Sequence, residues 1–242
     1  MRKGLQIILG ETKLIVPHNN REITFIHPLS KGNCFDVDQQ LQAKNLQDPT
    51  FGENISLLYS ASKKNVEEYS KEILNLIKNE SMWCFTGSLY LPKRKEYFSN
   101  GVIVQDRPQI QEGIIMDKSE LVKKLKNGKK VKGVLFSEDG SVRFVHFGYK
   151  TGEQTPQELG RNHYLLALTG SEETREKLVE LASKYSGKPY LHSYGRVDSE
   201  MSNISCLWTT QYRPKHIVID GTSYGFGMGR DIIAFGVSRL EV

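Results

Sequence analysis

The chain has 242 residues, and its 33 basic against 28 acidic side chains give a formal net charge of +5. With 38% hydrophobic and 25% charged residues, the composition is typical of an ordinary soluble globular protein. The mild positive charge permits an anionic small molecule or a nucleic acid as a partner, but it lacks the sharp basic footprint of a dedicated nucleic-acid-binding protein.

The three cysteines, Cys34, Cys84 and Cys206, are far apart and form no CxxC pair. An odd, scattered set argues against a disulfide framework and a structural zinc site, so we expect buried, reduced thiols and a cytoplasmic protein. Glu11 and Lys13 interrupt the short apolar patch near the N-terminus, which argues against a secretory signal. The sequence has no run of about 18 apolar residues, so no membrane span is predicted.

The N-terminal third predicts strands followed by helices. Residues 5–9, 13–16 and 21–27 are rich in β-branched or aromatic residues and are bounded by turn formers, which favours strands. After a polar stretch with no predicted element, apolar residues recur at helical spacing in 48–64 and again in 65–80.

The rest of the chain predicts strands interspersed with three helices. Asp117, Thr155 and Ser171 are each suited to the start of a helix, and Asp139-Gly140 favours a tight hairpin turn. The predicted helices are 116–128, 155–170 and 171–187, and the predicted strands are 82–91, 100–106, two arms of a hairpin over 129–150, 188–201, 203–212, 216–220 and 232–242.

This order of elements predicts the fold class. Strands and helices are interspersed without regular βαβ alternation, and hairpins are evident, so we expect an α+β fold with a mainly antiparallel, possibly mixed, sheet flanked by several helices. We expect residues 1–242 to form a single compact domain. Two lobes dividing near 111–117 are the alternative, although that stretch lacks the composition of a linker.

A row of polar residues near the C-terminus is the first candidate site. His192, Tyr194, Arg196, Asp198 and Glu200 occupy alternate positions, so a strand would direct all five side chains to one face. Such a row can perform acid/base chemistry, with His192 as the catalytic group and Asp198 or Glu200 orienting it, while Tyr194 and Arg196 contact a ligand. The alternative is a solvated strand face whose charges pair across the sheet.

Basic residues provide a second group of candidates. Lysines are concentrated over 118–132, and the preceding stretch 90–98 mixes lysine and arginine with tyrosine and phenylalanine, a pattern that suits stacking and phosphate contacts on single-stranded nucleic acid. Lys150 precedes a predicted helix N-terminus, where backbone amides can receive an anion. The alternative is an ordinary solvated helix face, with lysines that also protect sheet edges.

The last candidate is a glycine-rich loop. Gly225, Gly227 and Gly229 alternate with bulky residues and are followed by Arg230. Their amides and the arginine suit a phosphate, but the spacing is not that of a dinucleotide fingerprint, and a strand is predicted to follow instead of a helix. A long hairpin loop explains the pattern more simply, and it would display the intervening apolar side chains as a flap or contact surface.

These patterns rank three functions. The leading hypothesis is a binding module for a phosphate-bearing ligand, a nucleotide or nucleic acid; the alternative is a small hydrolase or transferase centred on His192; and a non-catalytic protein-interaction domain is the third. The histidines show none of the spacings of metal ligands, so no metal site is predicted. The sequence identifies no cofactor, and it leaves the oligomeric state open.

Overall fold

The computed structural model describes residues 6–8, 11–63, 68–111, 113–185, 187–210, 215–223 and 232–238. The described helices are α1 (Cys34–Ala43), α2 (Phe51–Lys63), α3 (Glu68–Asn79), α4 (Lys118–Leu125), α5 (Pro156–Arg161), α6 (His163–Thr169) and α7 (Glu172–Ala182). The described strands are β1 (Gln6–Ile8), β2 (Glu11–His18), β3 (Arg21–Gly32), β4 (Leu46–Gln47), β5 (Ser81–Leu91), β6 (Gly101–Asp106), β7 (Gln109–Ile110), β8 (Ile114–Ile115), β9 (Lys129–Val131), β10 (Val134–Phe136), β11 (Val142–His146), β12 (Gly152–Glu153), β13 (Tyr190–His192), β14 (Met201–Thr209), β15 (Ile217–Ser223) and β16 (Ile232–Ser238).

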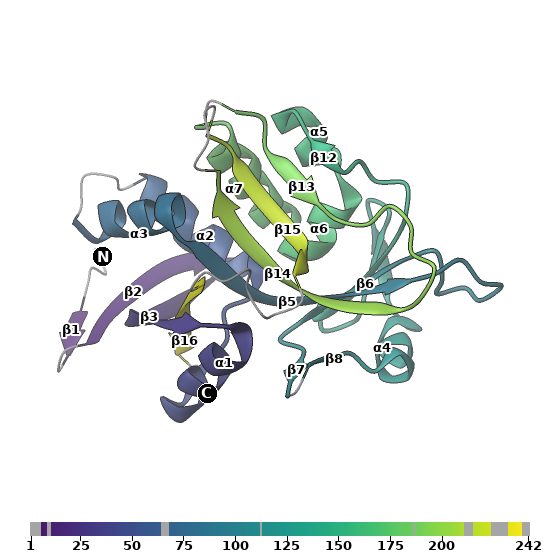
Figure 1. Cartoon of the computed structure of the whole chain (residues 1–242), viewed down its shortest axis with the longest axis horizontal. Coiled ribbons are helices and arrows are strands. Elements are labelled where there is room, and N and C mark those ends of the chain that lie inside the picture. The colour runs from purple at the N-terminus through teal and green to yellow at the C-terminus, as the bar shows by residue number, and fades with distance from the viewer. Residues whose placement is uncertain are drawn as a thin grey trace.

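One large sheet joins strands from every part of the chain, with β5 at its centre (Figure 1). β5 pairs antiparallel with β14 along one edge, while its other edge pairs with β16 near Ser81 and with β6 from Thr86 to Leu91. Beyond β16 lie β3 and β2, and beyond β6 lie β11, β10 and β9. Most pairs are antiparallel, whereas β16–β5 and β13–β15 are parallel. The predicted α+β fold with a mainly antiparallel sheet is confirmed.

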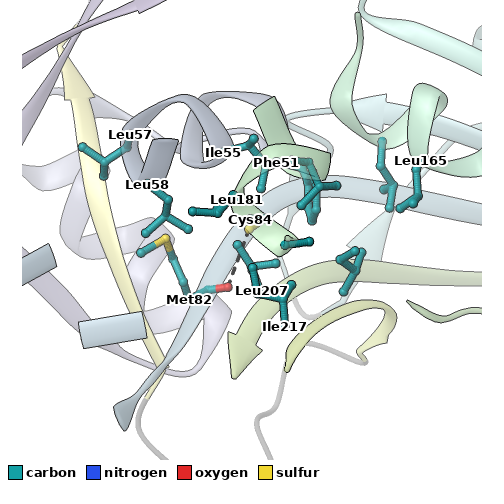
Figure 2. Packing of buried hydrophobic residues seen from close by; sticks show 14 of the residues in the cluster. Phe51, Ile55, Leu57, Leu58, Met82, Cys84, Leu165, Leu181, Leu207 and Ile217 are labelled. Carbon is teal, nitrogen blue, oxygen red and sulfur yellow. Dashed lines mark hydrogen bonds between the residues drawn. The ribbon is translucent and has the colours of Figure 1, made fainter. Parts of the chain in front are cut away.

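Both faces of β5 are buried, because successive side chains along a strand point to opposite faces of the sheet. On one face Met82 and Cys84 pack with α2, α3, α6 and α7, and Figure 2 shows part of this main core from close by. On the opposite face Trp83 packs with α1, and Leu89 packs with α4. Burial of each large apolar side chain contributes about 1.5–3 kcal/mol to stability. The three apolar clusters on the two faces of β5 therefore fix the position of this strand.

The cysteines are buried and free, as predicted. Burial raises the pKa of Cys34 and of Cys84 to about 12, so both thiols are protonated and unreactive at neutral pH. Cys84 lies among the packed side chains of the main core (Figure 2). These cysteines are therefore packing residues.

The sequence interpretation missed α1. Asn33 caps this helix by accepting hydrogen bonds from two amides of its first turn. Val37 and Leu41 are buried one helical turn apart, but the polar residues between and around them obscure the apolar face. A helix whose buried face is this narrow is easily read as a polar loop.

Two predicted elements are shorter than expected. The helix predicted to continue through Asn162 is interrupted there, because the extended backbone of Asn162 ends α5 and its side chain caps α6. The strand predicted over 188–201 stops at His192, so that prediction was wrong for its second part. Beyond His192 the carbonyl of Tyr194 accepts a hydrogen bond from the Tyr149 hydroxyl at 2.8 Å, a side-chain contact in place of a strand ladder.

One sheet contains strands from before and after residues 111–117, the stretch where the two-lobe alternative would divide the chain. β6 pairs with β11, and β5 pairs with β14, so strands from before and after this stretch are direct neighbours. On this ground we propose that the chain forms one domain. In the part of the chain that the structure describes, no helix combines the length and the apolar character needed to cross a bilayer.

Candidate functional site

Two connections meet at the end of the sheet where β5 stops and β14 begins, because Tyr90 of β5 pairs with Met201 of β14. One connection is the loop 92–100 between β5 and β6, and the other is the segment 193–200 between β13 and β14. α4 lies on the same side of the molecule (Figure 1), where Leu121 packs into an apolar cluster with residues of β5 and β6. Segments far apart in the sequence are thus brought together.

The loop 92–100 and α4 enclose a groove of about 500 Å³. We call it the aromatic–basic groove, and its lining residues are Glu96, Tyr97, Phe98, Lys118, Ser119 and Val122. Phe98 is anchored, because its ring packs edge-on against Phe144 with 5.2 Å between centroids. Tyr97 is 73% exposed and contacts Phe98 at 4.9 Å. The groove therefore presents an aromatic ring on which a flat ligand can stack.

The loop that carries Tyr97 is held by its own hydrogen bonds. The Ser99 hydroxyl lies 3.0 Å from the carbonyl oxygen of Arg94 and 2.7 Å from that of Glu96. The amide of Asn100 donates to the Pro92 carbonyl at 3.1 Å and closes the base of the loop. A loop ordered in this way loses little conformational entropy when a ligand binds, so the exposed ring is pre-organised.

Lys118, the first residue of α4, is the charged centre of the groove. Its Nζ donates hydrogen bonds to Glu96 Oε2 and to Glu200 Oε1, both at 3.0 Å. Burial lowers the pKa of Lys118, but the hydrogen bonds to the two carboxylates outweigh burial and the net direction is upward. The hydrogen bond from Lys118 likewise lowers the pKa of Glu96. Arg94 NH1 lies 3.8 Å from the same Glu200 oxygen, so two cationic side chains approach one carboxylate.

Two further lysines on the loop 92–100 are not paired with carboxylates of the described residues. Lys93 and Lys95 are exposed, and neither forms an ion pair with any residue that the structure describes. The groove thus combines an exposed aromatic ring with a lysine held by carboxylates, and the loop 92–100 that forms one of its walls carries two more exposed lysines.

The proposed catalytic residues do not assemble. His192 is exposed at the end of β13, and its ring contacts Tyr190 with 4.5 Å between centroids. Among the described residues, neither Asp198 nor Glu200 forms a hydrogen bond or ion pair with His192. Asp198 pairs instead with Arg196, and Glu200 pairs with Lys118. Because His192 has no orienting carboxylate here, the geometry lends no support to the acid/base hypothesis.

The proposed ligand-binding residues are spread over different places. Arg196 pairs with Asp198 at 3.2 Å, and the two side chains are 85% and 90% exposed. Tyr194 is half-buried, and its ring meets Tyr90 edge-on at 4.9 Å. Lys150 pairs with Glu158 at 2.7 Å, away from the aromatic–basic groove lining. Residues Gly225, Gly227, Gly229 and Arg230 lie outside the described residues.

A buried hydroxyl network supports the connection between β13 and β14. The Tyr90 hydroxyl donates to the carbonyl of Gly221 at 2.8 Å and lies 2.9 Å from the Tyr164 hydroxyl and 3.2 Å from Ser193 Oγ. The Tyr149 hydroxyl lies 3.0 Å from the same Ser193 oxygen. Burial raises the pKa of all three tyrosines, so these phenols stay protonated and serve as structural hydrogen-bond partners.

Other parts of the described chain are weaker candidates for a binding site. No three histidine, cysteine, aspartate or glutamate side chains among the described residues come together in a way that could hold a metal ion. A second groove of about 520 Å³ lies between the β9–β10 hairpin and the α6–α7 junction. Its charges are mixed, with Lys129 of the predicted basic stretch 118–132 against Glu138 and Glu172, and its aromatic lining residue, Phe136, is half-buried. The aromatic–basic groove is therefore the stronger candidate.

Comparison with known proteins adds a fold but no family. No protein-family model matches the chain, and no curated protein is significantly similar in sequence. A solved structure described as the accommodation of massive sequence variation in Nanoarchaeota by the C-type lectin fold has a TM-score of 0.51 and 9% identity, covering 86% of this chain and 97% of that chain. At this identity the similarity concerns the fold alone. The chain has a fold similar to the C-type lectin fold.

Proposed function

We propose that the chain is a binding module for a ligand that carries both phosphate and an aromatic base, a nucleotide or a nucleic acid, and that this ligand binds in the aromatic–basic groove. The observation that carries the proposal is the exposed ring of Tyr97, which lines the groove with Lys118 and is displayed on an ordered loop that also carries the exposed Lys93 and Lys95. Stacking and charge attraction are the two interactions that such a ligand requires.

The expected binding free energies require contributions from both the tyrosine ring and the lysines. Stacking of one base on an aromatic side chain contributes about 1–3 kcal/mol, which alone gives weak binding. Lysines that contact phosphate release counterions from a nucleic acid, so they strengthen binding at low salt and make it salt-dependent. A base on Tyr97 would place its phosphate within the cationic surroundings of the same loop.

The fold similarity supports only the general part of the proposal. The protein of the solved structure is described as accommodating massive sequence variation on this fold. A fold that tolerates varied residues suits a module whose ligand is chosen by a few side chains at one end of the sheet. The ligand itself must be argued from the groove, since one fold can carry many functions.

The ring is tested by a matched pair of substitutions. We expect Tyr97→Leu to weaken binding by about tenfold, because leucine keeps apolar area but offers no π-face, whereas Tyr97→Phe keeps wild-type affinity. Binding is measured at low salt by fluorescence anisotropy, using a labelled single-stranded oligothymidine and a labelled mononucleotide as separate probes. The relative affinity of the two probes shows whether a chain of phosphates is needed. Absence of binding to both, or equal binding by the leucine variant, refutes the proposal.

The cations are tested through salt dependence. We expect the double variant Lys93→Gln/Lys95→Gln to bind the oligonucleotide more weakly and to lower the slope of log affinity against log salt by about one to two. Lys44→Gln, at the end of α1, removes a positive charge far from the groove and is expected to leave the slope unchanged. Equal slopes for the double variant and the wild type would exclude Lys93 and Lys95 as phosphate contacts.

A further inference from the structure

Two ion pairs that share Lys118 join three segments of the chain at the groove. Lys118 begins α4, Glu96 belongs to the loop 92–100, and Glu200 directly precedes β14. Each carboxylate accepts a hydrogen bond from the single ammonium group of Lys118 at 3.0 Å. One ammonium group is therefore hydrogen-bonded to two carboxylates, and a phosphate oxygen can accept the same kind of charge-assisted hydrogen bond from it.

Glu200 is held in this position by its neighbours in the chain. The next residue, Met201, pairs with Tyr90 in the sheet, and Val197 earlier in the same connection is buried at 8% exposure. The backbone of Tyr194 is tied to Tyr149 at the start of the connection. The Glu200 carboxylate is thus presented to Lys118 from a connection that is fixed at both ends.

We infer that Glu200 is an internal competitor for the phosphate of the ligand. This inference rests on the proposed function, and it concerns the regulation of the same site. In the free protein the Glu200 carboxylate occupies the anion position beside Lys118 and Arg94, where the distances are 3.0 Å and 3.8 Å. A phosphate group enters by displacing this carboxylate, which moves into solvent. The affinity for the ligand therefore depends on how much more strongly Lys118 binds the phosphate than the Glu200 carboxylate.

The burial of the partners fits an exchange of this kind. The side chains of Lys118 and Glu200 are 25% and 33% exposed, so the pair is reachable from solvent. Glu96 is 55% exposed and can turn away without leaving a buried charge. An ion pair at such a surface has a small net free energy, because screening and side-chain entropy offset the attraction. A ligand with more charge than one carboxylate can replace it.

The test compares two glutamates of equal charge. Glu200→Gln removes the competitor, while Glu120→Gln removes a carboxylate of α4 that pairs with Lys123 at 2.6 Å and does not line the groove. The probe is the labelled single-stranded oligothymidine at a fixed low salt concentration. We expect Glu200→Gln to bind about fivefold more tightly than the wild type, the factor that corresponds to one surface ion pair, and Glu120→Gln to change affinity by less than about twofold.

A double-mutant cycle separates displacement from a general change of charge. If Glu200 competes at Lys118, then Glu200→Gln gives no gain in a Lys118→Met background. Equal affinities of Glu200→Gln and Glu120→Gln, or an undiminished gain in the Lys118→Met background, would overturn the inference. The proposed function would still stand if the wild type binds the probe and Tyr97→Leu binds it more weakly. Failure of both the wild type and Glu200→Gln to bind would overturn the proposed function and the inference together.

Discussion

Two ion-pair networks of the same chemistry lie in different surroundings. Arg143 is 1% exposed and donates two hydrogen bonds of 2.6 Å to the carboxylate of Asp106, plus a third to the Gly140 carbonyl at 2.8 Å. Lys118 is 25% exposed and holds two carboxylates with a single ammonium group. The first pair is bidentate and its guanidinium is sealed from solvent, although Asp106 is 24% exposed, whereas every member of the second network is at least 25% exposed.

The difference shows how to separate structural charges from binding charges. Asp106 also accepts from Thr86, whose hydroxyl accepts from the amide of Phe51. That network ties the 137–142 turn, β6, β5 and the start of α2 together, so its charges are committed to the fold. The charges around Lys118 join exposed loops, and either carboxylate can leave it for water. Burial and the number of fixed partners, not residue type, distinguish the two networks.

The sealed network is expected to give the largest effect on stability. Arg143→Met keeps most of the side-chain volume but leaves the carboxylate of Asp106 without its cation. Breaking a fully buried pair costs about 3–5 kcal/mol of unfolding free energy, and because Asp106 is 24% exposed we expect a loss near the lower end of that range. Chemical denaturation monitored by tryptophan fluorescence measures it. A loss below about 1 kcal/mol would mean that water replaces the guanidinium, and it would remove the contrast between the networks.

Asp48, a half-buried carboxylate that forms no ion pair with any described residue, sharpens the comparison. Burial, then the neighbouring carboxylate of Asp38, raises the pKa of Asp48 to about 7, from an ordinary value of 3.8. Between these values the folded state keeps a proton that the unfolded state has lost. Stability is therefore greatest below about pH 4 as far as this group is concerned, and it falls as the pH rises towards 7.

We expect the unfolding free energy of the wild type to fall by on the order of 2–4 kcal/mol across that interval through Asp48. Asp48→Asn, which cannot ionise, is expected to lose this dependence and to be the more stable protein above about pH 7. Asp36→Asn, on the exposed side of α1, serves as the control and retains the wild-type dependence. An unchanged pH profile in Asp48→Asn would show that the carboxylate is solvated in the folded state.

Much of the fold could be predicted from local patterns. The helix starts at Asp117, Thr155 and Ser171 are confirmed, because capping depends on residues within one turn. The hairpin at Asp139-Gly140 is also confirmed, with β10 paired to β11. α1 was missed because its apolar face is narrow.

The groove could be predicted only in part. The aromatic and basic residues near Tyr97 are adjacent in the sequence, so their combination was visible. The pairing of Lys118 with Glu200, 82 residues apart, depends on the sheet register that places Met201 beside Tyr90. The alternation of polar residues around His192 predicted a strand, but after His192 the backbone forms a hydrogen bond with a buried tyrosine hydroxyl instead of pairing in the sheet. Tertiary contacts decided both points, and no local spacing encodes them.

The open network is expected to give the smallest effect on stability, and that result is the most informative. Lys118→Met leaves Glu96 and Glu200 exposed to water, so the unfolding free energy should fall by less than about 1 kcal/mol, and by still less at high salt. Denaturation of Lys118→Met beside Arg143→Met under the same conditions compares the two networks directly. A loss as large as that of Arg143→Met would show that Lys118 holds the loop 92–100 and the connection before β14 together as a structural link. A small loss means that the groove keeps its shape when the ion pair opens, which is what exchange of Glu200 for a phosphate requires.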